Sequence, residues 1–295
     1  MSVNQRIPRW CVGVLAILCA TTTLAAEPQR LTTDGRYKDA PAFIDPAAQE
    51  LAFIVQESPQ LMRAMRLRLA DGSVAPLNPE WHKNEFEPAF SRDGTWLASV
   101  QSRGNLSMAL VVRAFPEGRE FEVPPEGGFC GFRSPTFTPD GKHVYYSFAD
   151  RDRQSIMAVN RQGGDKRTII DGPGHANWPS FAPDGKRFVF GSTRHGNYEI
   201  YVALADGSDV RRLTENPRQD IRPRFSPDGR RIAFTSGRDG NYEIYVMQAD
   251  GSNSQRLTVN PERDDYASWH PDSRHLVYVS ERNGRHDLYM LDAGE

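Results

Sequence analysis

Short runs of alternating hydrophobic and polar residues predict β-strands along most of this chain, and no amphipathic-helix pattern extends over a useful length. Residues 221–258 show the unit most clearly. The runs are Ile221–Phe225, Arg231–Ser236, Tyr242–Met247 and Gln255–Thr258. Ser-Pro-Asp-Gly at 226–229 predicts a tight turn, because Pro fixes φ at its second position and Gly tolerates a positive φ at its fourth. The unit is therefore predicted to be four short antiparallel strands.

This unit recurs six times, marked by Pro-x-Phe-Ser-Pro-Asp-Gly-(Lys/Arg) or a looser copy of it. The marker aromatics are Phe43, Phe90, Phe137, Phe181, Phe225 and Trp269, at intervals of 47, 47, 44, 44 and 44 residues. Four strands per repeat of this length are typical of a β-propeller blade. We therefore expect an all-β, six-bladed β-propeller with four antiparallel strands per blade. Its blade cores are expected near residues 40–77, 87–124, 134–170, 178–214, 222–258 and 266–291.

The last unit lacks its outermost strand, and the N-terminal part of the chain offers a replacement. Gln29-Arg30-Leu31-Thr32 matches residues 255–258, and Leu31 precedes Phe43 by 12 residues, as Leu257 precedes Trp269. We predict that residues 29–32 complete the last blade and close the ring, which removes two exposed sheet edges. The alternative, an open solenoid of the same units, would leave residues 29–32 without a partner strand.

The first 25 residues have the composition of a signal peptide. Arg6 and Arg9 precede an apolar run at residues 11–20, and small residues follow up to Ala25. The apolar run is shorter than the roughly 20 residues that span a bilayer. An uncleaved signal anchor and a lipoprotein signal at Cys19 are the alternatives. We predict cleavage after residue 25, a mature propeller of residues 26–295 without a membrane span, and a periplasmic or secreted location.

Composition narrows the class of protein. Lys and Arg number 36 against 38 Asp and Glu, so no cationic excess favours nucleic-acid binding. An apolar fraction of 38% with 10% aromatic residues excludes intrinsic disorder. Two of the three cysteines lie in the predicted signal peptide, which leaves Cys130 without an internal disulfide partner. We expect a monomer held together by its core, with Cys130 as a buried structural residue.

The repeat resembles that of the TolB family. The resemblance rests on the Pro-x-Phe-Ser-Pro-Asp-Gly marker and on Glu-Ile-Tyr-Val-Met-x-Ala-Asp-Gly-Ser…Arg-Leu-Thr at 243–258, and it covers residues 29–295. It implies a periplasmic partner of the Tol–Pal envelope system, in which the propeller docks the peptidoglycan-associated lipoprotein. That family also carries an N-terminal α/β domain that meets TolA. The few residues between the predicted cleavage site and the 29–32 strand leave no room for it, which puts a TolA contact in doubt.

Carboxylates, arginines and large aromatics gather just before each Pro-x-aromatic element, where a propeller presents one mouth of its channel. Trp, Tyr and Arg are favoured in the energetic centres of protein interfaces. We predict a partner-binding mouth formed by Glu87, Arg133, Asn177, Trp178, Asp220, Arg222, Asp265 and Tyr266. The alternative is structural: Arg222 and Asp220 would pair with neighbouring blades, and the aromatics would fill gaps between sheets.

Signatures of catalysis are mostly missing. Neither Gly-x-Ser-x-Gly nor His-Glu-x-x-His occurs, and the seven histidines show no obvious ligand spacing. No cofactor is expected, although Asp39, Asp220, Asp264 and Asp265 could offer oxygen ligands to Ca²⁺ at the mouth. The sequence thus favours a non-catalytic protein-binding module of the cell envelope. The alternatives are a metal-dependent hydrolase or lyase acting on a carbohydrate or lactone at the channel mouth, and a purely structural or sensory propeller.

Overall fold

A computed structural model describes residue 1 and residues 27–104, 107–124, 131–150 and 153–294. The predicted signal peptide, apart from Met1, and Cys130 lie outside these residues. Within the described ranges the regular structure is all β. No helix among them has the length and apolar character needed to cross a bilayer.

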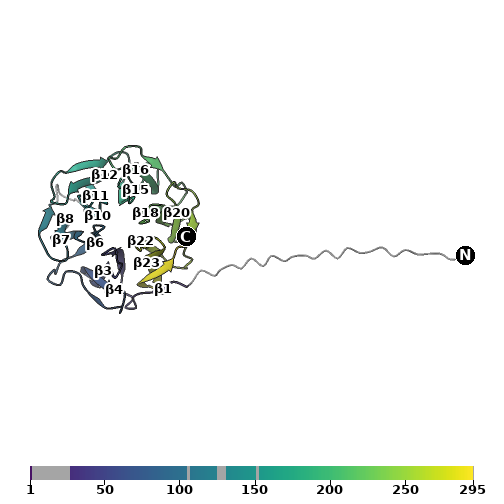
Figure 1. Cartoon of the computed structure of the whole chain (residues 1–295), viewed down its shortest axis with the longest axis horizontal. Helices are drawn as coiled ribbons and strands as arrows, with labels where there is room; N and C mark the ends of the chain where they lie inside the picture. The colour runs from purple at the N-terminus through teal and green to yellow at the C-terminus, as the bar shows by residue number, and fades with distance from the viewer. Residues whose placement is uncertain (2–26, 105–106, 125–130, 151–152, 295) are drawn as a thin grey trace.

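Six four-stranded antiparallel sheets surround a central channel, which confirms the predicted propeller (Figure 1). Blade one consists of β2 (Lys38–Phe43), β3 (Glu50–Ser58), β4 (Leu61–Arg68) and β5 (Val74–Pro76). Blade two consists of β6 (Glu85–Phe90), β7 (Trp96–Gly104), β8 (Ser107–Ala114) and β9 (Glu120–Val123). Blade three consists of β10 (Gly131–Phe137), β11 (His143–Asp150), β12 (Arg153–Asn160) and β13 (Arg167–Ile170).

Blades four to six continue the same order from the channel outwards. Blade four consists of β14 (Ala176–Phe181), β15 (Arg187–Ser192), β16 (Glu199–Leu204) and β17 (Arg211–Arg212). Blade five consists of β18 (Asp220–Phe225), β19 (Arg231–Ser236), β20 (Glu243–Gln248) and β21 (Gln255–Arg256). Blade six consists of β22 (Asp264–Trp269), β23 (His275–Arg282), β24 (Arg285–Asp292) and β1 (Gln29–Arg30).

The first strand closes the ring, as the repeat predicts. β1 pairs antiparallel with β24, with Arg30 opposite Tyr289, and the Leu31 N–H donates to the carbonyl of Leu288 at 2.8 Å. The outer strand of blade six therefore comes from the other end of the chain, with β24 between it and β23 (Figure 1).

The core lies between blades rather than within any one of them. Each sheet packs its buried side chains against the next sheet, which explains the nearly continuous apolar runs in the middle strands. The seam between blades six and one is built in the same way: Val279 and Leu288 pack with Leu51 and Phe53. Burying this seam stabilises the closed ring by the same hydrophobic effect that holds the other blades together.

Candidate functional site

Each of the six innermost strands carries a β-bulge at the same place, near its start. The bulge contains one non-glycine residue with a left-handed backbone, and φ ranges from 48° to 59° at Ala40, Glu87, Ser134, Trp178, Arg222 and Tyr266. Non-glycine residues rarely adopt this conformation, and it concentrates at functional sites. A bulge re-aims the side chain that it carries. Here it directs six side chains, one from each blade, towards the channel.

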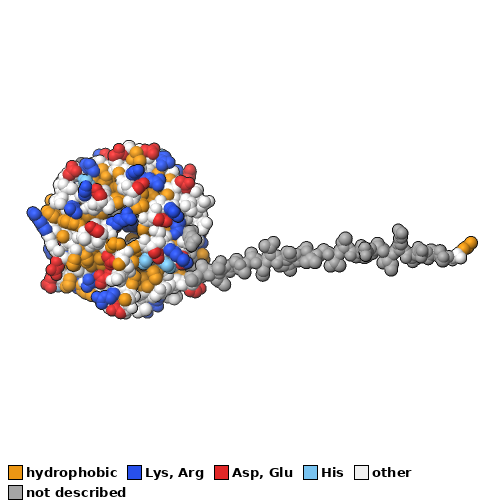
Figure 2. All heavy atoms as spheres, viewed as in Figure 1, with side chains coloured by type: hydrophobic (Ala, Val, Ile, Leu, Met, Phe, Trp, Pro, Cys, Tyr) orange, Lys and Arg blue, Asp and Glu red, His pale blue; other side chains and the backbone are white. Residues whose placement is uncertain are grey.

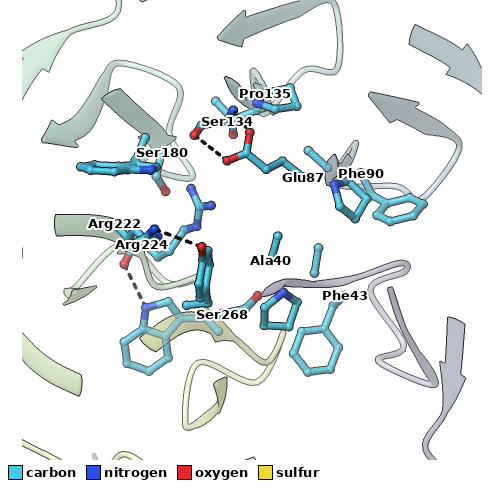
Figure 3. A pocket seen from close by; sticks show the side chains of 18 residues that line it. Ala40, Phe43, Glu87, Phe90, Ser134, Pro135, Ser180, Arg222, Arg224 and Ser268 are labelled. Atoms are coloured by element: carbon cyan, nitrogen blue, oxygen red, sulfur yellow. Dashed lines mark hydrogen bonds between the residues drawn. The ribbon is translucent and has the colours of Figure 1, made fainter. Parts of the chain in front are cut away.

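Two cavities form around these bulges. The six residues all line a channel cavity of about 240 Å³. A second cavity of about 280 Å³, which we call the mouth, is lined by Asp39, Phe86, Glu87, Arg133, Gln154, Asn177, Trp178, Arg222 and Tyr266. Figure 3 shows the Arg222 side chain reaching into the channel, with the Glu87 carboxylate turned towards Ser134. On the face shown in Figure 2, side chains of both charge signs surround a hollowed centre.

Arg222 connects blade five to blade six at the mouth. Its Nη1 lies 3.1 Å from Asp265 Oδ2, and its Nη2 donates to the Tyr266 hydroxyl at 3.1 Å. The guanidinium carbon lies 4.1 Å from the centroid of the Tyr266 ring and 5.2 Å from that of Trp178. These distances allow cation–π attraction to both rings. Arg222, Tyr266 and Trp178 therefore form one rigid unit, and the acidic partner of Arg222 is Asp265 of the neighbouring blade.

Asp265 is the buried anion of this unit. Burial opposes its ionisation, but the Arg222 and Arg263 guanidiniums outweigh that effect and hold the Asp265 pKa below its usual value. The Thr235 hydroxyl and the backbone N–H of Tyr266 each donate to its Oδ1 at 2.7 Å. Asp265 therefore stays charged at neutral pH, with its oxygens committed to protein partners.

Blades two, three and four are joined at the mouth by polar contacts. The Ser134 N–H donates to Glu87 Oε2 at 2.6 Å, and the Ser134 hydroxyl lies 3.3 Å from Asn177 Oδ1. That amide oxygen also accepts the Trp178 N–H at 2.9 Å. The positions of Glu87, Asn177 and Trp178 are thereby coupled across three blades.

A glycine makes space for the Trp178 indole. Gly191 lies opposite Asn177 on β15, and a Cβ added to it would come within 2.8 Å of Trp178 Cε3. The corresponding positions are Ser147 in blade three and Thr235 in blade five. The indole also contacts Tyr198, with ring centroids 5.0 Å apart.

Two ionisable side chains at the mouth, Asp39 and Arg133, have polar atoms that can still bind a ligand or partner. Asp39 Oδ1 is buried without a hydrogen-bond partner, while its Oδ2 accepts the Tyr37 hydroxyl at 3.3 Å. Burial, followed by the nearby charge of Glu87, raises the pKa of Asp39 to about 7. Arg133 is exposed, and no acidic side chain in the described part of the chain forms an ion pair with it.

Two predicted site residues lie inside their own blades. Asp220 Oδ2 accepts from Arg238 and Asn216 at 2.8 Å each, and Asp264 Oδ1 accepts from Asn260 at 2.8 Å. Neither residue lines the channel cavity or the mouth. The four carboxylates considered for Ca²⁺ therefore do not share one cavity, which does not fit the six to eight oxygen ligands that Ca²⁺ takes at one site.

The mouth also includes residues that the sequence did not single out, namely Phe86 and Gln154, while the Tyr37 hydroxyl donates a hydrogen bond to Asp39. Phe86 occupies the same repeat position as Asp39, Arg133 and Asn177, so the repeat spacing could have indicated it. Gln154 comes from β12, the third strand of its blade, where no feature of the repeat points to the channel.

Comparison with known sequences identifies the family. The model of the TolB beta propeller domain matches residues 48–223. The chain belongs to this family. A second model, the Tricorn protease N-terminal beta propeller domain, matches residues 202–291 of this TolB-type propeller. No curated protein sequence matches the chain significantly.

Solved structures agree with this assignment. TolB from Acinetobacter baumannii is 19% identical with a TM-score of 0.69, and covers 83% of this chain and 64% of its own. The putative TolB from Agrobacterium tumefaciens is 21% identical with a TM-score of 0.70, and covers 90% and 93%. An oligogalacturonate lyase in complex with manganese is 18% identical with a TM-score of 0.63, and covers 90% and 79%. At these identities the likeness establishes the fold alone.

Proposed function

We propose that this TolB-type propeller is a non-catalytic protein-binding module of the cell envelope that docks a partner at the mouth. The observation that carries the proposal is the set of six left-handed bulges, which turn Glu87, Trp178, Arg222 and Tyr266 towards one opening. Backbone strain repeated in every blade at one end of the channel costs stability, which favours a functional reason for it.

The chemistry of the mouth suits a protein segment. Trp178 and Tyr266 present aromatic surface held rigid by Arg222 and by the packing against Gly191. Rigid aromatic anchors surrounded by polar groups are typical of interface hot spots. Exposed Arg133 offers a cation to an acidic group of the partner, and the free Asp39 oxygen offers an acceptor to a donor group.

The partner proposed is an envelope protein of the peptidoglycan-associated lipoprotein type, following the family resemblance. The propeller would reach it as a monomer in the periplasm, exported by the signal peptide of residues 1–25. Docking of this kind requires neither nucleic acid nor a cofactor.

Site-specific photo-crosslinking in the producing cell tests the proposal. A crosslinking amino acid replaces Arg133 at the mouth, and the control replaces Arg92, an exposed arginine that lines a cavity of about 230 Å³ at the other end of the channel. The proposal predicts a crosslink from position 133, but not from position 92, to a lipoprotein identified by mass spectrometry. Equal labelling from both positions, or none from position 133, would contradict it.

A second candidate function is a hydrolase or lyase acting on a carbohydrate or lactone. Its support is Asp39, whose buried carboxyl with a pKa of about 7 has the protonation behaviour of a general base. Turnover of oligogalacturonides or lactones, assayed with and without Mn²⁺ or Ca²⁺, would favour this function if Asp39→Asn abolished it. Absence of turnover by the parent protein would argue for docking alone.

A further inference from the structure

The turn between β22 and β23 brings together three side chains that commonly bind metals. His270, Asp272 and His275 each offer one ligand atom, and these atoms all lie within 4.8 Å of one another. No other group of three or more such side chains in the described residues meets that distance. The spacing of the histidines alone gives no metal-site pattern, because the third ligand in this His-x-Asp-x-x-His turn is a carboxylate.

The carboxylate lies between the two imidazoles. His270 Nδ1 is 3.0 Å from Asp272 Oδ1, and His275 Nδ1 is 2.7 Å from Asp272 Oδ2. The side chains are 24%, 38% and 36% exposed, so solvent reaches all three. The Asp272 N–H donates to His270 Nδ1 at 3.2 Å. That hydrogen bond occupies the Nδ1 lone pair, so a metal bound at Nδ1 would replace the Asp272 N–H and would join the imidazole and the carboxylate through one cation.

The repeat itself provides a comparison, because the same turn occurs in the other blades without this cluster. In blade five Ser226 takes the place of His270, and its hydroxyl donates to Asp228 Oδ1 at 2.6 Å and accepts the Arg231 N–H at 3.0 Å. Arg231 takes the place of His275. The turn therefore forms without histidine, and folding alone does not account for two imidazoles in blade six.

We propose that His270, Asp272 and His275 form a binding site for a divalent transition metal of the Zn²⁺ class. Two imidazoles and one carboxylate are ligands that Zn²⁺ accepts readily. Zinc–ligand bonds of about 2.0–2.2 Å place tetrahedral ligand atoms about 3.3 Å apart, so only a small adjustment of this exposed turn is needed. Three protein ligands leave a fourth position for water or an external ligand.

The site is separate from the mouth, since it follows the far end of β22. His270 also packs edge-on against Phe43 of blade one, with ring centroids 5.0 Å apart. The metal would therefore fix the blade-six turn where that blade meets blade one, at the seam of the closed ring. Binding there should raise the thermal stability of the whole propeller, because a ligand that binds only the folded state stabilises it.

Zinc binding by the full mature chain, free of any histidine tag, tests the proposal near pH 7.5. We expect one Zn²⁺ per chain by isothermal titration calorimetry, a rise in Tm on adding zinc, and visible absorption bands when Co²⁺ replaces Zn²⁺. His270→Ser and His275→Arg install the blade-five residues, so the fold should be retained. Each should weaken binding about tenfold or more and abolish the Tm rise, since loss of even outer-shell support costs this much.

Two further variants separate this site from adventitious surface binding. His82→Ala removes an exposed histidine elsewhere and should leave the affinity unchanged. Thr138→His in blade three supplies the missing imidazole beside Asp140 and His143, and should add a second Zn²⁺ per chain. The proposal fails if the parent binds no zinc, or if the affinity is the same after His270→Ser and His275→Arg.

Discussion

The Thr32 hydroxyl donates to Asp287 Oδ1 at 2.8 Å, which joins the segment just after β1 to β24 across 255 residues of sequence. Its oxygen also accepts the Leu288 N–H at 3.0 Å. Within blade five Thr258 makes the same two contacts, to Glu243 at 2.6 Å and to the Ile244 N–H at 2.9 Å. The closing strand thus reproduces between the chain ends a contact that other blades make locally.

Thr32→Val should destabilise the propeller by about 1–3 kcal/mol, because it leaves buried Asp287 and Leu288 groups without their hydroxyl partner. Urea denaturation measures the change. Thr258→Val is the matched control, since it removes the same contacts inside one blade. If Thr258→Val is costly while Thr32→Val costs nothing, the closure contributes no stability and this account of the ring is wrong.

The buried carboxyls Asp39 and Glu85 should make stability decline as the pH rises from about 4 to about 7. Burial raises the pKa of each to about 7, so the folded state keeps a proton that the unfolded chain has already released. Asp39→Asn should therefore become more stable relative to the parent over this range, by up to a few kcal/mol. Denaturation at several pH values checks the slope, with Glu85→Gln as a parallel case. A pH-independent difference between Asp39→Asn and the parent would contradict the assignment.

Arg222→Met should cost a few kcal/mol of stability, because it leaves the buried Asp265 carboxylate with only Arg263 as a cationic partner. The double variant Arg222→Met with Asp265→Asn should recover part of that loss. Thermal denaturation of the single and double variants gives the coupling. Additive losses in the double variant would mean that the two residues do not form one unit.

Gly191→Ala should displace the Trp178 indole, since the new methyl group would meet Trp178 Cε3. Near-UV circular dichroism reports the change in aromatic packing, and partner affinity should fall with it. Gly237→Ala is a suitable control, because its backbone is not left-handed and its added Cβ comes no closer than 3.5 Å to another residue, although both variants need a stability check. Unchanged spectra and affinity in Gly191→Ala would show that Trp178 is not held by this glycine.

The sequence was sufficient to predict the blades and the closure because both repeat. Marker aromatics such as Phe225 recur at fixed intervals, and Arg30 and Thr32 match Arg256 and Thr258. The site was predicted less completely. Asp220 and Asp265 look alike in sequence, yet they point to different places, because they occupy adjacent repeat positions and side chains alternate along a strand.

Long-range partners account for the remaining differences. Arg238, from the loop after β19, pairs with Asp220 and holds it inside blade five, and no local pattern indicates that contact. Gln154 lines the mouth from β12, the third strand of its blade, and no local sequence pattern indicates that position either. The cluster of His270, Asp272 and His275 could not be predicted from the repeat, because its two histidines stand at turn positions that Ser226 and Arg231 occupy in blade five.

The affinity of the partner for two charge-reversal variants tests the docking account most directly. Arg133→Glu reverses an exposed charge at the mouth, and Arg92→Glu makes the same change at the other end of the channel. With the crosslinked lipoprotein as ligand, calorimetry should show Arg133→Glu weakening binding by at least about tenfold and Arg92→Glu leaving it unchanged. Equal affinity for Arg133→Glu and the parent protein would contradict docking at the mouth.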